Sequence, residues 1–279
     1  MRWTVGFGLA LLLLAAPAAA QDMKALYAEV LTLQDQPDDL TSLRERLSQT
    51  DSTMPQNMDQ LDELLADDKP RELLAALMQV DDYDGVVANM NWERRRIYGG
   101  ANIAVAFAYL TDLRRTTPPG KRGENLRDTQ VMMAAYVFAV IRADGPRCAD
   151  PTALAKRLQQ LVEQNPEVMA HAAKLPQDRR ETVKYIALIS EIATAPVRKN
   201  DSVLCAPPVQ EGLAGIAQGL LAEAEKPGQM ECKQGDLGKT CVLPSPAAKF
   251  RPESEWRPGR DAARKALPDE MDRFLKLGG

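Results

Sequence analysis

Helical spacing of apolar residues is the feature that most constrains the fold of this chain. Apolar side chains recur every three or four residues through most of the 279-residue sequence, and prolines separate one such segment from the next. This period places the apolar side chains on one face of each helix. The one short strand-like segment is Thr240-Cys241-Val242-Leu243. We therefore expect an all-α fold, a bundle or array of about ten helices.

The first twenty residues have the pattern of a secretory signal peptide. Arg2 precedes an uncharged apolar run from Val5 to Ala16, and Pro17 is followed by the small residues Ala18-Ala19-Ala20. We expect cleavage before Gln21 and a periplasmic or secreted mature protein. No later segment reaches the roughly 18 consecutive apolar residues of a membrane span, so no transmembrane segment is expected in the mature chain.

Charge and proline content divide the mature chain into regions. Residues 21–115 form an acidic helical region, in which 16 acidic and 5 basic residues lie between positions 22 and 84. Residues 116–123, which include two adjacent prolines, are the expected linker to a central helical region at 125–226. Residues 227–279 are expected to form loops up to position 257, followed by a helix over 260–277 that is interrupted or restarted at Pro268.

Two of the expected helices carry specific predictions. A long helix from about Trp92 to Arg115 is expected to be kinked or broken at Gly99-Gly100, because glycine is unfavourable inside a helix. The segment 126–143 is apolar on most of its sides, which predicts a central, buried helix.

The four cysteines form an even set, which suits disulfide bonding in an oxidising compartment. Cys232 and Cys241 enclose a short glycine-containing loop that a disulfide would close, whereas Cys148 and Cys205 each lie in a proline-flanked turn. Four cysteines allow three pairings, and Cys148–Cys205 with Cys232–Cys241 is the pairing that these local patterns favour. We therefore expect a disulfide-closed loop region near the C-terminus.

Several chemistries have no support in the sequence. The net charge of −4 gives no basic footprint for nucleic acid. His171 is the only histidine, and its immediate neighbours in Met169-Ala170-His171-Ala172-Ala173 are all uncharged, so a structural role is predicted for it. One histidine and the absence of a C-x-x-C pair exclude the usual zinc motifs. We expect neither a metal nor another cofactor.

Glu191 is the residue that best fits catalysis. It follows the apolar segment Ala187-Leu188-Ile189-Ser190, and a carboxyl in such surroundings suits a general acid. Its position resembles that of the catalytic Glu of lytic transglycosylases, although their Ser after the Glu and their Gly-Leu-Met-Gln-like segment are missing here. An enzyme that cleaves cell-wall glycan through Glu191 is therefore one alternative hypothesis.

Arg94-Arg95-Arg96 forms a short cationic segment in the long helix. It either contacts an acidic partner or lipid headgroups, or pairs with the acidic N-terminal region. We treat these three arginines as candidate partner-binding residues.

The segments Tyr185-Ile186-Ala187, Leu204-Cys205-Ala206-Pro207-Pro208-Val209 and Gly219-Leu220-Leu221 resemble parts of the periplasmic amidase-immunity (Tai-type) proteins of type VI secretion. Those are small, helical, disulfide-bonded proteins that block a toxin by binding it. The cysteine that precedes the tyrosine in that family and its terminal Pro-Cys are not found here, so no family residue is transferred. The resemblance implies a second alternative, an inhibitor of a periplasmic toxin.

Together these observations predict a non-catalytic helical module that binds or scaffolds another protein of the cell envelope. Acidic and basic surfaces would supply the charge complementarity for that partner.

Overall fold

The computed structural model describes residues 17–33, 38–49, 53–206, 231–235, 238–242 and 248–277. Eleven α-helices lie within these residues, so the predicted all-α fold is confirmed. Most of the expected signal peptide, and the part of the expected central helical region from 207 to 226, lie outside the described residues. Within the described part of the chain, no helix is both long and apolar enough to cross a membrane.

The helices follow the proline-marked segments of the sequence closely. Their bounds are α1 Pro17–Thr32, α2 Thr41–Ser48, α3 Met58–Ala66, α4 Pro70–Met78, α5 Tyr83–Tyr98, α6 Ile103–Thr116, α7 Glu124–Asp144, α8 Thr152–Gln164, α9 Pro166–Lys174, α10 Gln177–Thr194 and α12 Glu253–Phe274. Two 3₁₀ turns, η2 Gly120–Gly123 and η3 Gly145–Arg147, flank α7.

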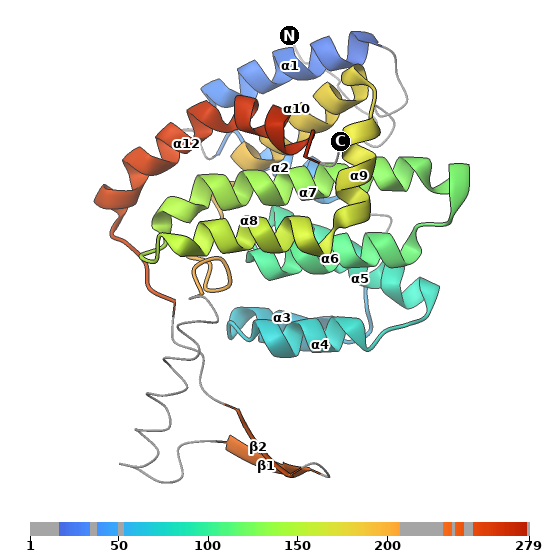
Figure 1. Ribbon diagram of the computed structural model, residues 1–279, viewed down its shortest axis with the longest axis vertical. Helices are drawn as coiled ribbons and strands as arrows, with labels where there is room; N and C mark the ends of the chain where they lie inside the picture. The colour runs from blue at the N-terminus through green and yellow to red at the C-terminus, as the bar shows by residue number, and fades with distance from the viewer. Residues whose placement is uncertain are drawn as a thin grey trace.

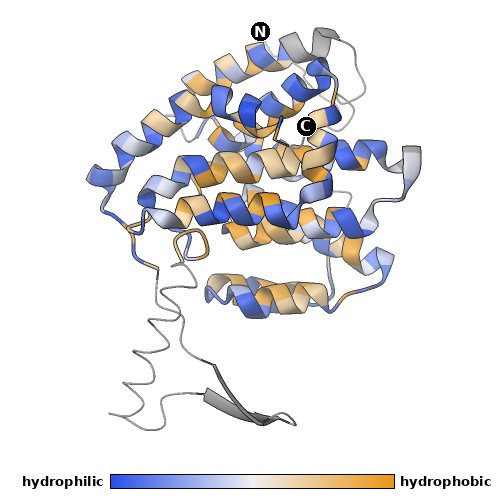
Figure 2. Cartoon of the chain, in the orientation of Figure 1, coloured by the Kyte–Doolittle hydropathy of each residue, from blue (hydrophilic) through white to orange (hydrophobic). Residues whose placement is uncertain are grey.

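Helix α7 lies at the centre of the fold, as its apolar sequence predicts. It packs against α6, α8, α9, α10 and α12, and 14 of its 21 residues are buried. Figure 1 shows α7 crossing the middle of the molecule, with α1 and α12 on one side and α3 and α4 on the other. The outer helix α8 instead alternates hydrophobic and hydrophilic residues along its length, as Figure 2 shows, because only one of its faces is covered.

The acidic region 21–115 and the central region 125–226 share one hydrophobic core. A single cluster of buried apolar side chains runs from Met23 in α1 through Leu113 in α6 and Ala139 in α7 to Phe274 in α12. The segment 116–123 therefore joins two parts of one core. A smaller cluster around Leu40 and Ile192 packs α1, α2, α5 and α10 together.

The long helix expected up to Arg115 is broken at the two glycines, as predicted. Helix α5 ends at Tyr98 and α6 begins at Ile103. Gly100 has φ +87°, and a Cβ there would lie 2.4 Å from the carbonyl oxygen of Val197. Only glycine fits such a backbone and such a close approach.

The predicted start of that helix near Trp92 was wrong. Helix α5 begins at Tyr83, because the side chain of Asp82 accepts a hydrogen bond of 2.8 Å from the backbone N–H of Gly85 and caps the helix.

The C-terminal region contains more regular structure than the sequence predicted. Strands β1 Glu231–Gly235 and β2 Gly238–Val242 pair in an antiparallel hairpin, and α12 begins at Glu253, within the segment expected to be loop. Helix α12 also continues through Pro258 and Pro268 without the expected interruption. Its buried Leu267, Met271 and Phe274 pack against the core, and this packing stabilises a helix that two prolines disfavour.

The cysteines agree with the favoured pairing where the structure describes them. Cys148, just after η3, is joined to Cys205 by a disulfide across 57 residues of sequence. Cys232 and Cys241 are opposite one another in the register of the β1–β2 hairpin. The disulfide between Cys232 and Cys241 stays a prediction.

We expect the Cys148→Ser/Cys205→Ser variant to lose about 2–4 kcal/mol of unfolding free energy, because the disulfide restricts a long loop of the unfolded chain. Urea unfolding of oxidised protein measures this loss. A Cys232→Ser/Cys241→Ser variant is the matched control and should lose less, because it opens a much shorter loop. Equal midpoints for the wild type and the Cys148→Ser/Cys205→Ser variant would contradict the prediction.

Candidate functional site

Glu191, the residue singled out for catalysis, is buried in an ion-pair network. It lies on α10, and its residue surface is only 1% exposed. Its Oε1 accepts hydrogen bonds from Arg198 at 2.5 Å and from Arg264 of α12 at 2.9 Å. One oxygen of this carboxylate is thus committed to two ion pairs within the fold.

Arg198 extends this network to a second buried carboxylate. Its Nε donates to Asp144 at the end of α7 at 2.6 Å, and its Nη1 donates to the backbone carbonyl of Glu191 at 2.9 Å. Burial raises the pKa of Asp144, but Arg198 and Arg147 outweigh burial and hold it below its usual value. The network connects α7, η3, α10 and α12 through ion pairs.

The space beside Glu191 is too small for a sugar. The cavity that this residue lines with Tyr27, Leu188 and Leu267 has a volume of about 10 Å³, enough for roughly one water molecule. A glycan-cleaving enzyme requires an open groove around its acid. The surroundings of Glu191 favour a structural role, and we do not carry the hydrolase hypothesis further.

We expect Arg198→Ala to lower the unfolding free energy by about 3–5 kcal/mol, because it leaves two buried carboxylates without their shared partner. Chemical denaturation measures this change. Lys69→Ala, which breaks an exposed ion pair with Asp67, is the control and should change stability by less than about 1 kcal/mol. Similar losses for both variants would contradict the structural role of the network.

The three arginines at 94–96 do not form one surface patch. Arg94 donates its Nε to the backbone carbonyl of Leu47 at the end of α2, at 2.8 Å. Arg96 pairs with Asp62 of α3 and lies over the ring of Trp92. Within the described residues only Arg95 of the three is exposed. Arg94 and Arg96 thus hold α2 and α3 against α5, and Arg96 does so through an ion pair with an acidic residue of the N-terminal region.

His171 has an acidic partner that its local sequence does not show. Its Nε2 lies 2.8 Å from Oδ1 of Asp128, which belongs to α7 and is 43 residues earlier in the chain. The other oxygen of Asp128 accepts from Arg179 of α10 at 3.0 Å. Among the described residues, no serine, threonine or cysteine side chain is hydrogen-bonded to His171. The trio links α7, α9 and α10 and lacks a nucleophile.

Sequence reasoning also missed a pair of buried carboxyl groups between α5 and α6. Glu93 and Asp112 are both fully buried. Asp112 accepts a hydrogen bond from Arg115 at 2.9 Å, but neither oxygen of Glu93 has a hydrogen-bond partner among the described residues. Burial and the charge of Asp112 raise the pKa of Glu93 well above its usual value. Glu93 is therefore protonated at a pH where an exposed glutamate is charged.

We expect Glu93→Gln to raise the melting temperature at pH 8 and to have little effect near pH 4. A carboxyl whose pKa is raised by folding stabilises the fold only while protonated, so this stability is lost as pH rises from the unfolded pKa of about 4.3 through the folded one. Glutamine keeps the shape without this ionisation. Thermal melts over the pH series test the prediction, with the exposed Glu63→Gln as control. A shift that is equal at every pH would contradict it.

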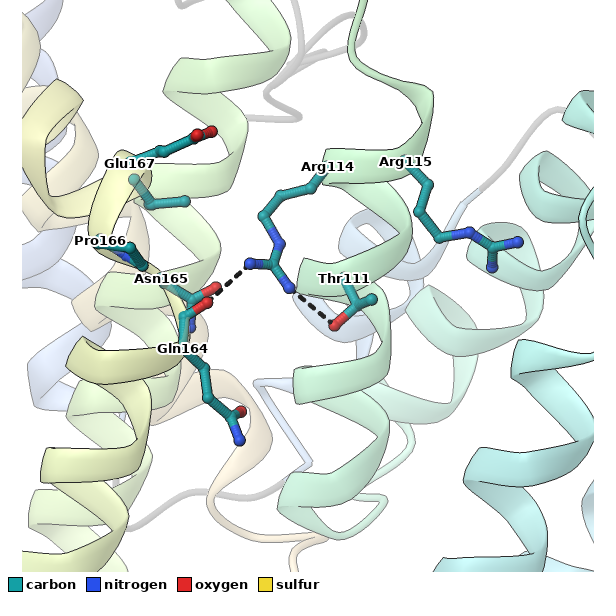
Figure 3. A pocket seen from close by; sticks show the side chains of 8 residues that line it. Thr111, Arg114, Arg115, Gln164, Asn165, Pro166 and Glu167 are labelled. Carbon is teal, nitrogen blue, oxygen red and sulfur yellow. Dashed lines mark hydrogen bonds between the residues drawn. The ribbon is translucent and has the colours of Figure 1, made fainter.

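The surface also carries an open, polar cleft. It lies between α6 and the junction of α8 and α9, has a volume of about 510 Å³, and is lined by Thr111, Arg114, Arg115, Gln164, Asn165, Pro166, Glu167 and Val168. Figure 3 shows Arg114 reaching across it to the backbone carbonyl of Gln164, at 2.7 Å. Arg114 also donates to Thr111 of its own helix α6. No residue of this lining is a histidine or a cysteine. The cleft offers polar recognition but no nucleophile with its base.

The turn between α4 and α5 is the second surface feature. Met78 and Tyr83 are 40% and 65% exposed, and Asp81, Asp82 and Asp84 beside them are exposed as well. Arg115 donates to the backbone carbonyl of Val80, which joins this turn to α6 next to the cleft. The cap formed by Asp82 and the bond from Arg115 hold the turn in a fixed shape. We call Met78, Asp81, Asp82, Tyr83 and Asp84 the acidic turn.

Comparisons with known proteins do not assign this chain to a family. No family model matches the chain, and no curated protein and no solved structure gives a significant match. The resemblance to amidase-immunity proteins gains no support from these comparisons.

Proposed function

We propose that this protein is a non-catalytic binding module whose acidic turn docks a basic segment of another protein. The observation that carries the proposal is the exposure of Met78 and Tyr83 in the acidic turn. In the described part of the chain the only other exposed large hydrophobic residue is Leu277. Tyrosine and methionine are enriched in protein interfaces, and tyrosine often carries much of the binding energy.

Charge decides what kind of partner fits this surface. Three exposed aspartates lie beside Met78 and Tyr83 in the sequence. The chain from 22 to 84 contains 16 acidic and 5 basic residues. A lysine- or arginine-rich segment would complement these charges and associate faster at low salt. The fixed shape of the turn lowers the entropy lost on binding.

The cell envelope is the proposed location of this activity. The signal-peptide pattern of residues 1–20 and the Cys148–Cys205 disulfide support export. Cleavage before Gln21 would remove only the first four residues of α1 and would leave Met23 and Val30 in their buried positions. N-terminal sequencing of protein from the envelope tests this location, and a chain that retains residues 1–20 contradicts it.

An inhibitor of a periplasmic toxin is one form that such a module could take. For that case the partner is an enzyme with a basic surface, and the acidic turn is the contact that blocks it. The binding experiment below covers this form as well, because it depends on the same side chains.

We expect Tyr83→Ser/Met78→Ser to abolish capture of the partner from envelope extracts at low salt. The aspartates attract the partner, and the apolar side chains of Tyr83 and Met78 then hold it in contact. The variant removes these apolar contacts, so we expect the affinity to fall by at least about tenfold. Quantitative mass spectrometry of the captured proteins provides the measurement. High salt should release the same protein from the wild type, because salt screens the attraction between the aspartates and the basic segment of the partner.

Leu277→Ser is the matched control, since Leu277 is 61% exposed, close to the 65% of Tyr83, and is far from the acidic turn in the sequence. It should capture the same partner as the wild type. Identical capture by the wild type and Tyr83→Ser/Met78→Ser would refute the proposed function.

A further inference from the structure

Trp256 brings two arginines together near the start of α12. The Cζ atom of Arg147, in η3, lies 4.7 Å from the centroid of the indole ring, and that of Arg260 lies 4.8 Å from it. Both distances are within the roughly 6 Å over which a guanidinium is attracted to an aromatic ring. The positive charges of Arg147 and Arg260 thus both lie against the half-buried ring of Trp256.

The fold places these residues in a fixed arrangement. The backbone N–H of Arg251 donates to the carbonyl of Arg147 at 2.8 Å, which ties the segment before α12 to η3. At Gly259 a Cβ would lie 3.1 Å from a side-chain atom of Pro146, so the missing side chain lets α12 approach η3 closely. The backbone hydrogen bond and the close approach at Gly259 therefore bring α12 and η3 together at Trp256.

The buried carboxylates in this part of the molecule already have arginine partners. Two carboxylates are buried here, and both bind Arg198 or Arg264 directly. Arg147 shares one of them at 3.4 Å. The charges that act on Arg260 are those of Arg264 and Arg147, which are positive, and those of Asp144 and Glu191, which are negative. Because Arg198 and Arg264 already bind these two carboxylates, Arg260 has no carboxylate of its own within the described part of the chain.

Arg260 differs from Arg147, Arg198 and Arg264, each of which pairs with a carboxylate. It makes no hydrogen bond or ion pair with any described residue, and its Nε is buried without a partner. Burial, followed by the neighbouring charge of Arg264, lowers its pKa below the usual value. A half-buried guanidinium without an anion is unfavourable, and its donors are free for a ligand.

We propose that Arg260, Arg147 and Trp256 form a binding site for a phosphate group. A phosphate group supplies the negative charge that Arg260 lacks, and its oxygens match the donors of a guanidinium. The indole supports the guanidinium planes and limits their motion. This site is separate from the acidic turn, so it stands or falls independently of the proposed function.

Tryptophan emission reports on this site directly. Trp256 is half-buried against the two arginines, whereas Trp92 is buried at the α3–α5 contact, where its Nε1 donates to Asp62. Titration of inorganic phosphate into the wild type, in phosphate-free buffer at constant ionic strength, should give a saturable change in emission. Sodium acetate and sodium chloride at the same ionic strength should not.

Arg260→Gln should weaken phosphate binding by about tenfold or more, because it removes the uncommitted charge. Arg260→Lys keeps the charge without the planar group and should give an intermediate affinity. Arg257→Gln is the matched control. Arg257 belongs to the same helix but is exposed and paired with Glu253 at 2.7 Å, so its replacement should leave the affinity unchanged. Circular dichroism confirms that each variant is folded.

A second assay separates free phosphate from a lipid headgroup. Cosedimentation with vesicles of phosphatidylglycerol, compared with phosphatidylcholine, should depend on Arg260 if the phosphate belongs to a lipid. Arg260-dependent binding of inorganic phosphate without vesicle binding supports a soluble ligand. Equal responses of the wild type and Arg260→Gln to phosphate and to both vesicles would overturn the proposal.

Discussion

The pairing of Arg198 with two buried carboxylates is the interaction on which the arrangement of the helices depends. Asp144 ends α7, Glu191 lies inside α10, and Arg264 adds α12 to the same group of charges. Apolar side chains pull these helices together without fixing how they are aligned. Buried charges tolerate few alignments, because any shift leaves one of them unpaired.

Several ionisable groups are buried in this protein, and burial alone does not mark any of them as part of an active site. Glu191, Asp128 and Glu93 are all buried carboxyl groups, and each has a structural explanation in its surroundings. The first two bind arginines, and the third holds its proton because burial raises its pKa. The functional proposals therefore rest on features at the surface, where a partner or a ligand can reach them.

Sequence periodicity predicted most of the fold, because helix limits depend on local signals. Prolines and the glycines at 99 and 100 mark breaks that the structure reproduces. The start of α12 was missed, since its stability comes from distant packing while its own sequence contains two prolines. The candidate sites were harder to predict for the same reason. Glu191 meets Arg264 across 73 residues, and His171 meets Asp128 across 43. Such pairings are set by how helices dock and leave no local pattern.

The disulfide between Cys148 and Cys205 has a consequence for how the protein withstands proteases. The bond closes a covalent ring that contains α8, α9 and α10. A protease that cuts one peptide bond in the connections at Asn165 or Leu175 would open the ring without releasing a fragment. The two pieces would stay attached through sulfur and keep their shared core contacts.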